Sequence, residues 1–224
     1  MRVNLLDTDF YYINLEEEKE RNELVISKLT SLGISENKII RIDAIKAEGI
    51  PQDGVFRGCF LSQLKALKEA RIGNKPFVIL EDDVVINRFD ESIEIPDDSQ
   101  CVYLGLSSWG FSPSSDSNLA RLNSLIVDNT NPGIARIFNM LSSHSIMYID
   151  MGYVDSLIDR LERNFNGEIF SSSVEKINMR YFGGTMLPCD VIMADQQYNN
   201  KVYALRDPIF YQDGKHEYCT LIKI

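Results

Sequence analysis

The chain has 224 residues and a formal net charge of −10, from 23 basic and 33 acidic side chains. This length suits one large domain or two small ones, and it is enough to bury a sizeable hydrophobic core. Hydrophobic residues make up 44% of the chain, which excludes an intrinsically disordered protein. The acidic balance argues against nucleic acid or an anionic membrane as a partner, because both attract a positive surface.

The first half of the chain alternates strand and helix patterns. A β-branched and aromatic run over residues 10–15 predicts the first strand. The apolar spacing within residues 16–32 predicts a helix that ends at Gly33. A second strand is expected over residues 38–45 and a second helix over residues 59–73. The continuous apolar run at residues 75–80 is typical of a parallel strand covered on both faces.

The second half of the chain has a less regular pattern. Strands are expected at residues 101–106, 145–150 and 202–205, and helices at residues 153–164 and 188–199. Residues 107–133 are rich in Ser, Asn and Gly and predict a loop region with some local structure. No repeat or linker divides the sequence, so we expect a single domain over residues 1–224. The predicted fold class is α/β, with a mostly parallel sheet flanked by helices.

The cysteines and the N-terminus indicate the compartment. No pair of cysteines has the CxxC spacing, and their mostly apolar neighbours predict buried, reduced thiols. The four positions are Cys59, Cys101, Cys189 and Cys219. Asp7 and Asp9 interrupt the apolar residues of the N-terminus, and no segment approaches the roughly 20 apolar residues of a membrane span. We therefore expect a cytoplasmic protein with neither an export signal nor a membrane span.

Three consecutive carboxylates, Glu81, Asp82 and Asp83, follow the strand predicted at residues 75–80. Ligands of parallel α/β sheets bind outside the carboxyl ends of the strands, so the sequence places these residues at a binding crevice. Mg²⁺ and Mn²⁺ prefer carboxylate and phosphate oxygens and would relieve the repulsion among the three charges. In an extended segment Glu81 and Asp83 point to one side and Asp82 to the other. The alternative interpretation is a polar strand end that starts a turn.

Six segments in a fixed order give the chain a resemblance to a known family. They are YINL at 12–15 followed by Arg21, RIDA at 41–44, GC at 58–59 with SQ at 62–63, FVILEDDV at 77–84, PCD at 188–190 and PIFYQ at 208–212. In this order they resemble glycosyltransferase family 25, which includes lipopolysaccharide and procollagen galactosyltransferases. The chain departs from the family at Gln63, where a Ser-His pair is usual, and in the acidic EEEKER run after YINL.

The resemblance implies a GT-A fold and an inverting transfer of a sugar, galactose or glucose, from a nucleotide diphosphate such as UDP to a glycan or protein-linked hydroxyl. It also implies Mn²⁺ or Mg²⁺ as cofactor, with Asp83 as a direct ligand and His216 as a second one. An exposed histidine is the alternative for His216. Residues expected to contact the nucleotide sugar are Ile13, Asn14, Leu15, Arg21, Ala44, Ser62, Lys65, Glu81 and Asp82.

Several of these positions also have a structural alternative. Arg21 suits a phosphate contact, but it also suits an ion pair with a nearby Glu. Ser62 and Lys65, one helical turn apart, suit a ribose or diphosphate contact, but both also suit a solvated face. Trp109 follows a strand end, where it could stack on a sugar ring or be buried. His144 is expected to be structural.

An inverting transfer also needs a carboxylate base for the acceptor hydroxyl. Asp190 is the first choice, because the matching residue of the family lies at the start of a late helix. The alternative role for Asp190 is a helix N-cap, and Asp195 and Asp150 are weaker candidates for the base. Two other functions stay open, a non-catalytic binding module of this fold and a nucleotidyltransferase. Release of pyrophosphate instead of a nucleoside diphosphate would favour the second.

Overall fold

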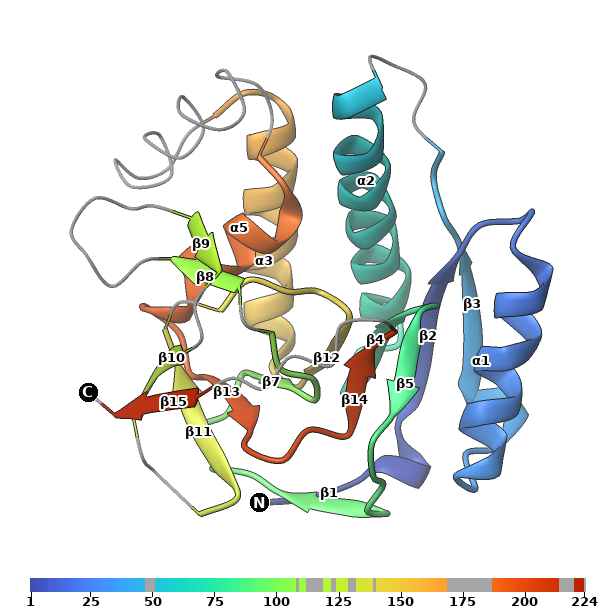
Figure 1. The fold of residues 1–224 in the computed structure, drawn as a ribbon, viewed down its shortest axis with the longest axis horizontal. Helices are drawn as coiled ribbons and strands as arrows, with labels where there is room; N and C mark the ends of the chain where they lie inside the picture. The colour runs from blue at the N-terminus through green and yellow to red at the C-terminus, as the bar shows by residue number, and fades with distance from the viewer. Residues whose placement is uncertain are drawn as a thin grey trace.

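The computed structural model describes residues 1–46, 51–107, 109–111, 119–121, 124–128, 132–138, 140–168, 187–213 and 220–223. Within these residues, a nine-stranded mixed sheet forms the centre of the molecule (Figure 1). Its strands, in spatial order, are β15 (Thr220–Lys223), β10 (Ser124–Asp128), β11 (Ile134–Ile137), β13 (Val202–Leu205), β7 (Cys101–Tyr103), β12 (Ser145–Tyr148), β4 (Phe77–Glu81), β2 (Asp9–Asn14) and β3 (Ile39–Asp43).

The sheet is mixed, with four parallel and four antiparallel pairs of neighbouring strands. β11 and β12 run antiparallel to both of their neighbours, and the other seven strands share one direction. Three small two-stranded sheets lie outside it. They pair β1 (Arg2–Asn4) with β6 (Ser92–Glu94), β5 (Val84–Ile86) with β14 (Phe210–Gln212), and β8 (Trp109–Phe111) with β9 (Leu119–Arg121). The expected α/β class is therefore present, and seven of the nine strands share the expected single direction, whereas β11 and β12 make the sheet a mixed one.

Helices cover both faces of the sheet (Figure 1). The α-helices of the described residues are α1 (Lys19–Ser31), α2 (Pro51–Arg71), α3 (Met151–Phe165) and α5 (Cys189–Gln197), with 3₁₀ turns at Leu5–Asp7 and Glu36–Lys38. Alternation along β2 makes two cores. Phe10 and Tyr12 pack with Leu29 of α1, whereas Ile13 belongs to the core that contains Phe60 of α2.

Local sequence explains most helix ends. Gly33 adopts a positive φ of 87° just after α1, where its N–H reaches the Thr30 carbonyl at 2.9 Å. Glycine populates this left-handed region at little cost, so the predicted stop is confirmed. The Asp150 carboxylate caps α3 by accepting a hydrogen bond of 2.6 Å from the Tyr153 N–H. Asp150 is thus a helix cap in this fold. α2 begins at Pro51, earlier than predicted, because proline suits the first turn of a helix.

Several predicted strand bounds were wrong. The strand expected at residues 101–106 ends at Tyr103, and Gly105 forms only an isolated bridge to Phe210. Gly105 lies against the His144 ring, and a Cβ at this position would lie 2.0 Å from His144 Nε2, so only glycine fits there. The strand expected at residues 145–150 ends at Tyr148, before the Asp150 cap. Within the region expected to be a loop, residues 107–133, the described parts contain β8, β9 and β10.

The carboxyl ends of β2, β3 and β4 meet at one edge of the sheet. Ile13 pairs with Glu81, and Asn14 pairs with Asp43, so the three strands end at the same level. This register brings the start of the acidic turn, Glu81, beside the segment that follows Asn14. None of the helices in the described part of the chain is both long and apolar enough to cross a membrane.

Candidate functional site

A cavity of about 450 Å³ opens where β2, β3 and β4 end. Its walls come from these three strand ends, from the start of α1 and from the middle of α2. The lining residues are Ile13, Leu15, Glu18, Arg21, Ala44, Ile45, Lys46, Gly58, Cys59, Ser62, Gln63, Glu81, Asp82 and Asp83. Most of the residues expected to contact a nucleotide sugar therefore line one cavity, at the edge of the sheet where the sequence placed a binding crevice.

The cavity has an apolar side and a charged side. Ile13 and Leu15 from the end of β2 lie with Ala44 and Ile45, which follow β3. The acidic turn after β4 supplies the carboxylates. Flat apolar rings suit the first side, whereas a cationic or metal-bound group suits the second.

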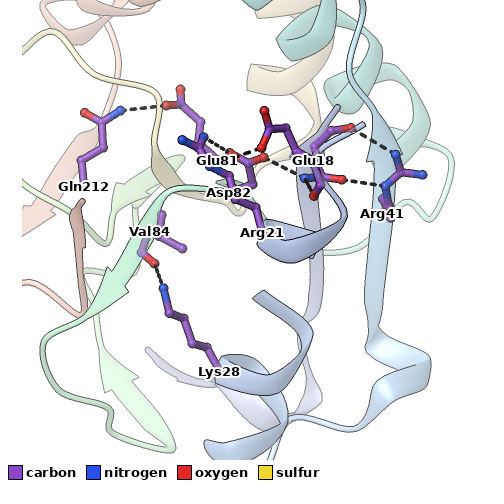
Figure 2. Close-up of polar contacts among 9 residues, drawn as sticks. Glu18, Arg21, Lys28, Arg41, Glu81, Asp82, Val84 and Gln212 are labelled. Carbon is purple, nitrogen blue, oxygen red and sulfur yellow. Dashed lines mark hydrogen bonds and ion pairs between the residues drawn. The ribbon is translucent and has the colours of Figure 1, made fainter. Parts of the chain in front are cut away.

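Glu81 is held by neutral donors from three other elements. Its Oε1 atom accepts a hydrogen bond of 2.7 Å from the Ser143 hydroxyl and has a longer contact of 3.4 Å with Gln63 Nε2. Its Oε2 atom accepts a hydrogen bond of 3.1 Å from Gln212 Nε2 (Figure 2). These partners, from α2, β14 and the segment before β12, occupy both carboxylate oxygens of Glu81.

Asp82 points away from Glu81, toward α1. Its Oδ2 atom accepts a hydrogen bond of 2.8 Å from Asn14 Nδ2, and its Oδ1 atom lies 3.3 Å from Arg21 Nη1. Arg21 also pairs with Glu18 at 3.9 Å (Figure 2). The structural alternative for Arg21, an ion pair with a nearby Glu, is therefore present, although Arg21 also lines the cavity with more than half of its side chain exposed.

Asn14 holds Asp82 and the start of α1 together through its side-chain amide. It is buried, and its Nδ2 atom bonds the Glu18 carbonyl at 3.1 Å in addition to Asp82. Its Oδ1 atom accepts a hydrogen bond of 3.0 Å from Arg41 Nε. Asn14 is not among the lining residues, so in this structure it positions Asp82 rather than facing the cavity.

Asp83 completes the turn between β4 and β5 and lines the cavity. Its carbonyl accepts a hydrogen bond of 2.7 Å from the Asp213 N–H, directly after β14 pairs with β5. The C-terminal part of the chain is thus attached to the acidic turn. In the described part of the chain, no three His, Cys, Asp or Glu side chains converge to form a metal site.

Ser62 and Lys65 have protein partners. The Ser62 hydroxyl accepts a hydrogen bond of 2.8 Å from the Ile45 N–H and donates one of 2.7 Å to the Gly58 carbonyl, so it joins the end of β3 to α2. Lys65 Nζ bonds the Asp43 carbonyl at 3.0 Å and is not among the lining residues. Ser62 borders the cavity, whereas Lys65 fixes the end of β3.

Cys59 corrects the expectation of buried thiols. Cys101 and Cys189 are buried, but Cys59 is exposed on α2 and lines the cavity. All three thiols are free, and Cys219 lies outside the described residues. Partial burial, together with the negative charges of Glu81, Asp190 and Asp83, raises the pKa of the Cys59 thiol. The first turn of α5 therefore lies close to the acidic turn of β4.

Asp190 lies in the first turn of α5, after Pro188. Burial raises the pKa of Asp190 to about 6, although hydrogen bonds from the backbone N–H groups of Asp190 and Val191 act in the opposite direction. The residue is only partly exposed. The alternative role of Asp190 as a helix N-cap is wrong, because Pro188 is the N-cap of α5 and Asp190 is the second residue of the helix. Its raised pKa is that of a group that exchanges protons near neutrality.

Of the remaining residues that the sequence singled out, His144 and Asp195 have protein partners. His144 is buried and bonds Ser142 through its Nδ1 atom, which agrees with a structural role. Asp195 forms an ion pair of 3.0 Å with Arg160 of α3. The side chain of Trp109 and the whole of His216 lie outside the described residues, so their expected roles stay predictions.

Sequence reasoning did not assign four residues that this geometry brings to the site. Gln63 was noted only as a departure from the Ser-His pair of the family, and Gln212 only as the last residue of the PIFYQ segment. Ser143 and Lys46 carried no signal, because a serine before a strand and a lysine in a loop are common. Lys46 lines the cavity and pairs with Glu17.

Comparisons with known proteins leave the family open. No family model matches the chain, and no curated protein matches it. A nucleoside-diphosphate-sugar pyrophosphorylase from Vibrio cholerae RC9 is 13% identical, with a TM-score of 0.44 over 97% of this chain and 74% of that one. A glycosyltransferase involved in glycosylation of the major capsid of PBCV-1 is 10% identical, with a TM-score of 0.34 over 88% and 92%. Both scores lie below 0.5, so these weak likenesses assign neither a fold family nor an activity.

Proposed function

We propose that the chain is a glycosyltransferase that moves a hexose from a nucleoside diphosphate, UDP in the first instance, to a hydroxyl of a glycan or a glycoprotein. The observation that carries the proposal is the cavity at the ends of β2, β3 and β4, which joins an apolar side to the acidic turn Glu81–Asp83. This arrangement matches a nucleotide sugar, because its base is flat and its diphosphate attracts cations. The family 25 resemblance of the same segments supports it.

The donor lies with its base on the apolar side. Ile13 and Ala44 pack against the base, and Ser62 borders the ribose. Arg21 and Lys46 are cations of the lining, and both are exposed enough to reach a phosphate. Both are paired with acidic side chains in the structure. When the diphosphate binds, it therefore replaces those carboxylates as the ion-pair partner of Arg21 and Lys46.

A divalent cation fits the donor atoms of this site when it arrives with the diphosphate. Mg²⁺ is usually held by one or two carboxylates together with substrate phosphates and water, rather than by a cage of protein groups. Asp83 is the carboxylate that would hold Mn²⁺ or Mg²⁺, with His216 as the second proposed ligand. Such an ion stabilises the charge that develops on the leaving nucleoside diphosphate.

Asp190 is proposed as the general base. It accepts the proton of the acceptor hydroxyl while that oxygen attacks the anomeric carbon from the side opposite the diphosphate. The bond from the anomeric carbon to the phosphate oxygen breaks, and the electron pair leaves with the nucleoside diphosphate, so the configuration inverts. A pKa of about 6 keeps Asp190 ionised above that pH while it remains a competent proton acceptor.

A thermal-shift screen tests the proposal. Wild-type protein is heated with UDP-galactose, UDP-glucose, GDP-mannose or ADP-glucose, each with and without Mn²⁺. A donor at about 100 times its Kd adds about 2.7 kcal/mol of stability, which is a clear rise in melting temperature. The expected result is a rise with one nucleotide sugar that becomes larger with Mn²⁺. No rise with any nucleotide sugar would contradict the proposal and favour a module that binds something else.

A further inference from the structure

The buried amide of Gln63 is an unusual feature of the cavity. Gln63 has 2% of its surface exposed and lines the cavity from α2. Its Nε2 atom faces two oxygens, Glu81 Oε1 and the Ser143 carbonyl, each at 3.4 Å. Its Oε1 atom is buried and has no hydrogen-bond partner among the described residues. Exchanging the two amide atoms would place an oxygen against those two oxygens, so the orientation is fixed.

A buried carbonyl oxygen without a donor needs an explanation. The large majority of buried side-chain polar atoms in proteins are hydrogen-bonded, and leaving one unpaired costs about 1–3 kcal/mol. Glu81 fixes the amide from one side, and none of the described residues donates a hydrogen bond to Gln63 Oε1, which leaves this oxygen able to accept one. A ligand hydroxyl in the cavity has the required chemistry.

The position of Gln63 on α2 indicates which part of a donor it meets. Cys59 lies one helical turn away on the same face, and its thiol interacts with the charges of Glu81, Asp190 and Asp83. Ser62 also borders the cavity, but its hydroxyl is bonded to the Ile45 N–H, just after β3. Cys59, on the same face of α2 as Gln63, is thus near both the acidic turn and Asp190, whereas the Ser62 hydroxyl is bonded to the segment after β3.

We propose that Gln63 is a specificity residue, whose Oε1 atom accepts a hydrogen bond from a hydroxyl of the transferred sugar. The inference rests on the proposed function, in which the sugar spans the gap between the diphosphate at Asp83 and the base Asp190. Glu81 is then a positioning residue, because its carboxylate orients the Gln63 amide and receives no part of the donor.

Calorimetry on Gln63→Met tests this assignment, because methionine has nearly the same length and lacks the amide. Dissociation constants of UDP-galactose, UDP-glucose and UDP are measured with Mn²⁺ for the wild type and the variant. Loss of one hydrogen bond should weaken binding of the preferred UDP-sugar about five- to tenfold and leave the Kd of UDP within about twofold. Gln212→Met is the matched control, since it removes the other amide donor to Glu81 and leaves Gln63 in place.

Deoxy analogues of the preferred UDP-sugar locate the hydroxyl. For the analogue that lacks the contacted hydroxyl, wild type and Gln63→Met should bind equally, which a merely structural role of Gln63 would not produce. The inference is overturned if Gln63→Met weakens UDP and the UDP-sugar by the same factor, or if Gln212→Met gives the same sugar-specific loss. If the wild type binds UDP and UDP-sugars with the same Kd, the proposed sugar contact of Gln63 is also overturned, but the proposed nucleotide site is not. A wild type that binds none of these compounds overturns both proposals.

Discussion

Replacing Asp190 with Asn should stabilise the protein above neutral pH while it abolishes transfer. Burial raises the pKa of Asp190 from 3.8 to about 6 in the folded chain. A carboxyl group with a higher pKa in the folded state binds protons more tightly when folded. Its ionisation therefore costs stability as the pH rises from about 4 to about 6, and the cost is complete above that interval.

The size of this cost follows from the two pKa values. Their difference is about 2, which corresponds to about 3 kcal/mol at about 1.4 kcal/mol for each tenfold change. Asparagine keeps an oxygen for the backbone N–H groups of α5, and the effect of these groups on the charged form is already contained in the pKa of about 6. The net gain for Asp190→Asn is therefore about 3 kcal/mol at about pH 8, and it vanishes at about pH 4.

Urea denaturation of both proteins at the two pH values measures the gain directly. Transfer by the variant should fall by about 100-fold or more, and wild-type kcat should decline below about pH 6 as the base is protonated. A stability difference that is the same at both pH values would refute the reasoning, because it would show that the charge of Asp190 is not the cause. Full transfer activity in the variant would refute the assignment of the base.

Three further substitutions test the site and its support. Asp83→Asn should lower the transfer rate by about 100-fold or more and remove the Mn²⁺ dependence of donor binding, while the melting temperature stays unchanged. If donor binding still depends on Mn²⁺, Asp83 does not hold the cation. Asn14→Ala should lower the free energy of unfolding by about 2–3 kcal/mol in urea, because it removes the hydrogen bonds of Asn14 to Asp82 and to the Glu18 carbonyl. An unchanged free energy of unfolding would contradict the support role of Asn14. Gly105→Ala should cost more than about 2 kcal/mol by the same assay, since the new Cβ would lie 2.0 Å from His144 Nε2. The matched control is Gly73→Ala, at an exposed position where the new Cβ would meet nothing closer than 3.5 Å, and it should unfold like wild type.

The sequence predicted the first half of the fold well, because the signals there are local. The apolar runs that became β2 and β4 alternate with amphipathic helices, and Gly33 marks a helix end by its own backbone preference. Strand direction alone predicted at which edge of the sheet the acidic turn lies. These features need no knowledge of which distant segments pair.

The remaining features depend on long-range pairing. β5 and β14 are far apart in the sequence, and with three residues each they are too short to be recognised as strands, although β5 is wholly apolar. The partners of Glu81 come from three separate elements, so no spacing in the sequence could reveal them. Cys59 was expected to be buried from its apolar neighbours, but its place on α2 turns it toward a cavity that only the assembled fold creates.

Product analysis tests the central claim most directly. Protein is incubated with the nucleotide sugar that it binds, Mn²⁺ and an acceptor glycan or water, and the nucleotide products are separated by anion-exchange chromatography. A glycosyltransferase releases the nucleoside diphosphate in a Mn²⁺-dependent reaction that Asp83→Asn and Asp190→Asn lose. Release of pyrophosphate with a nucleoside triphosphate substrate, or release of the diphosphate that both variants retain, would contradict the account.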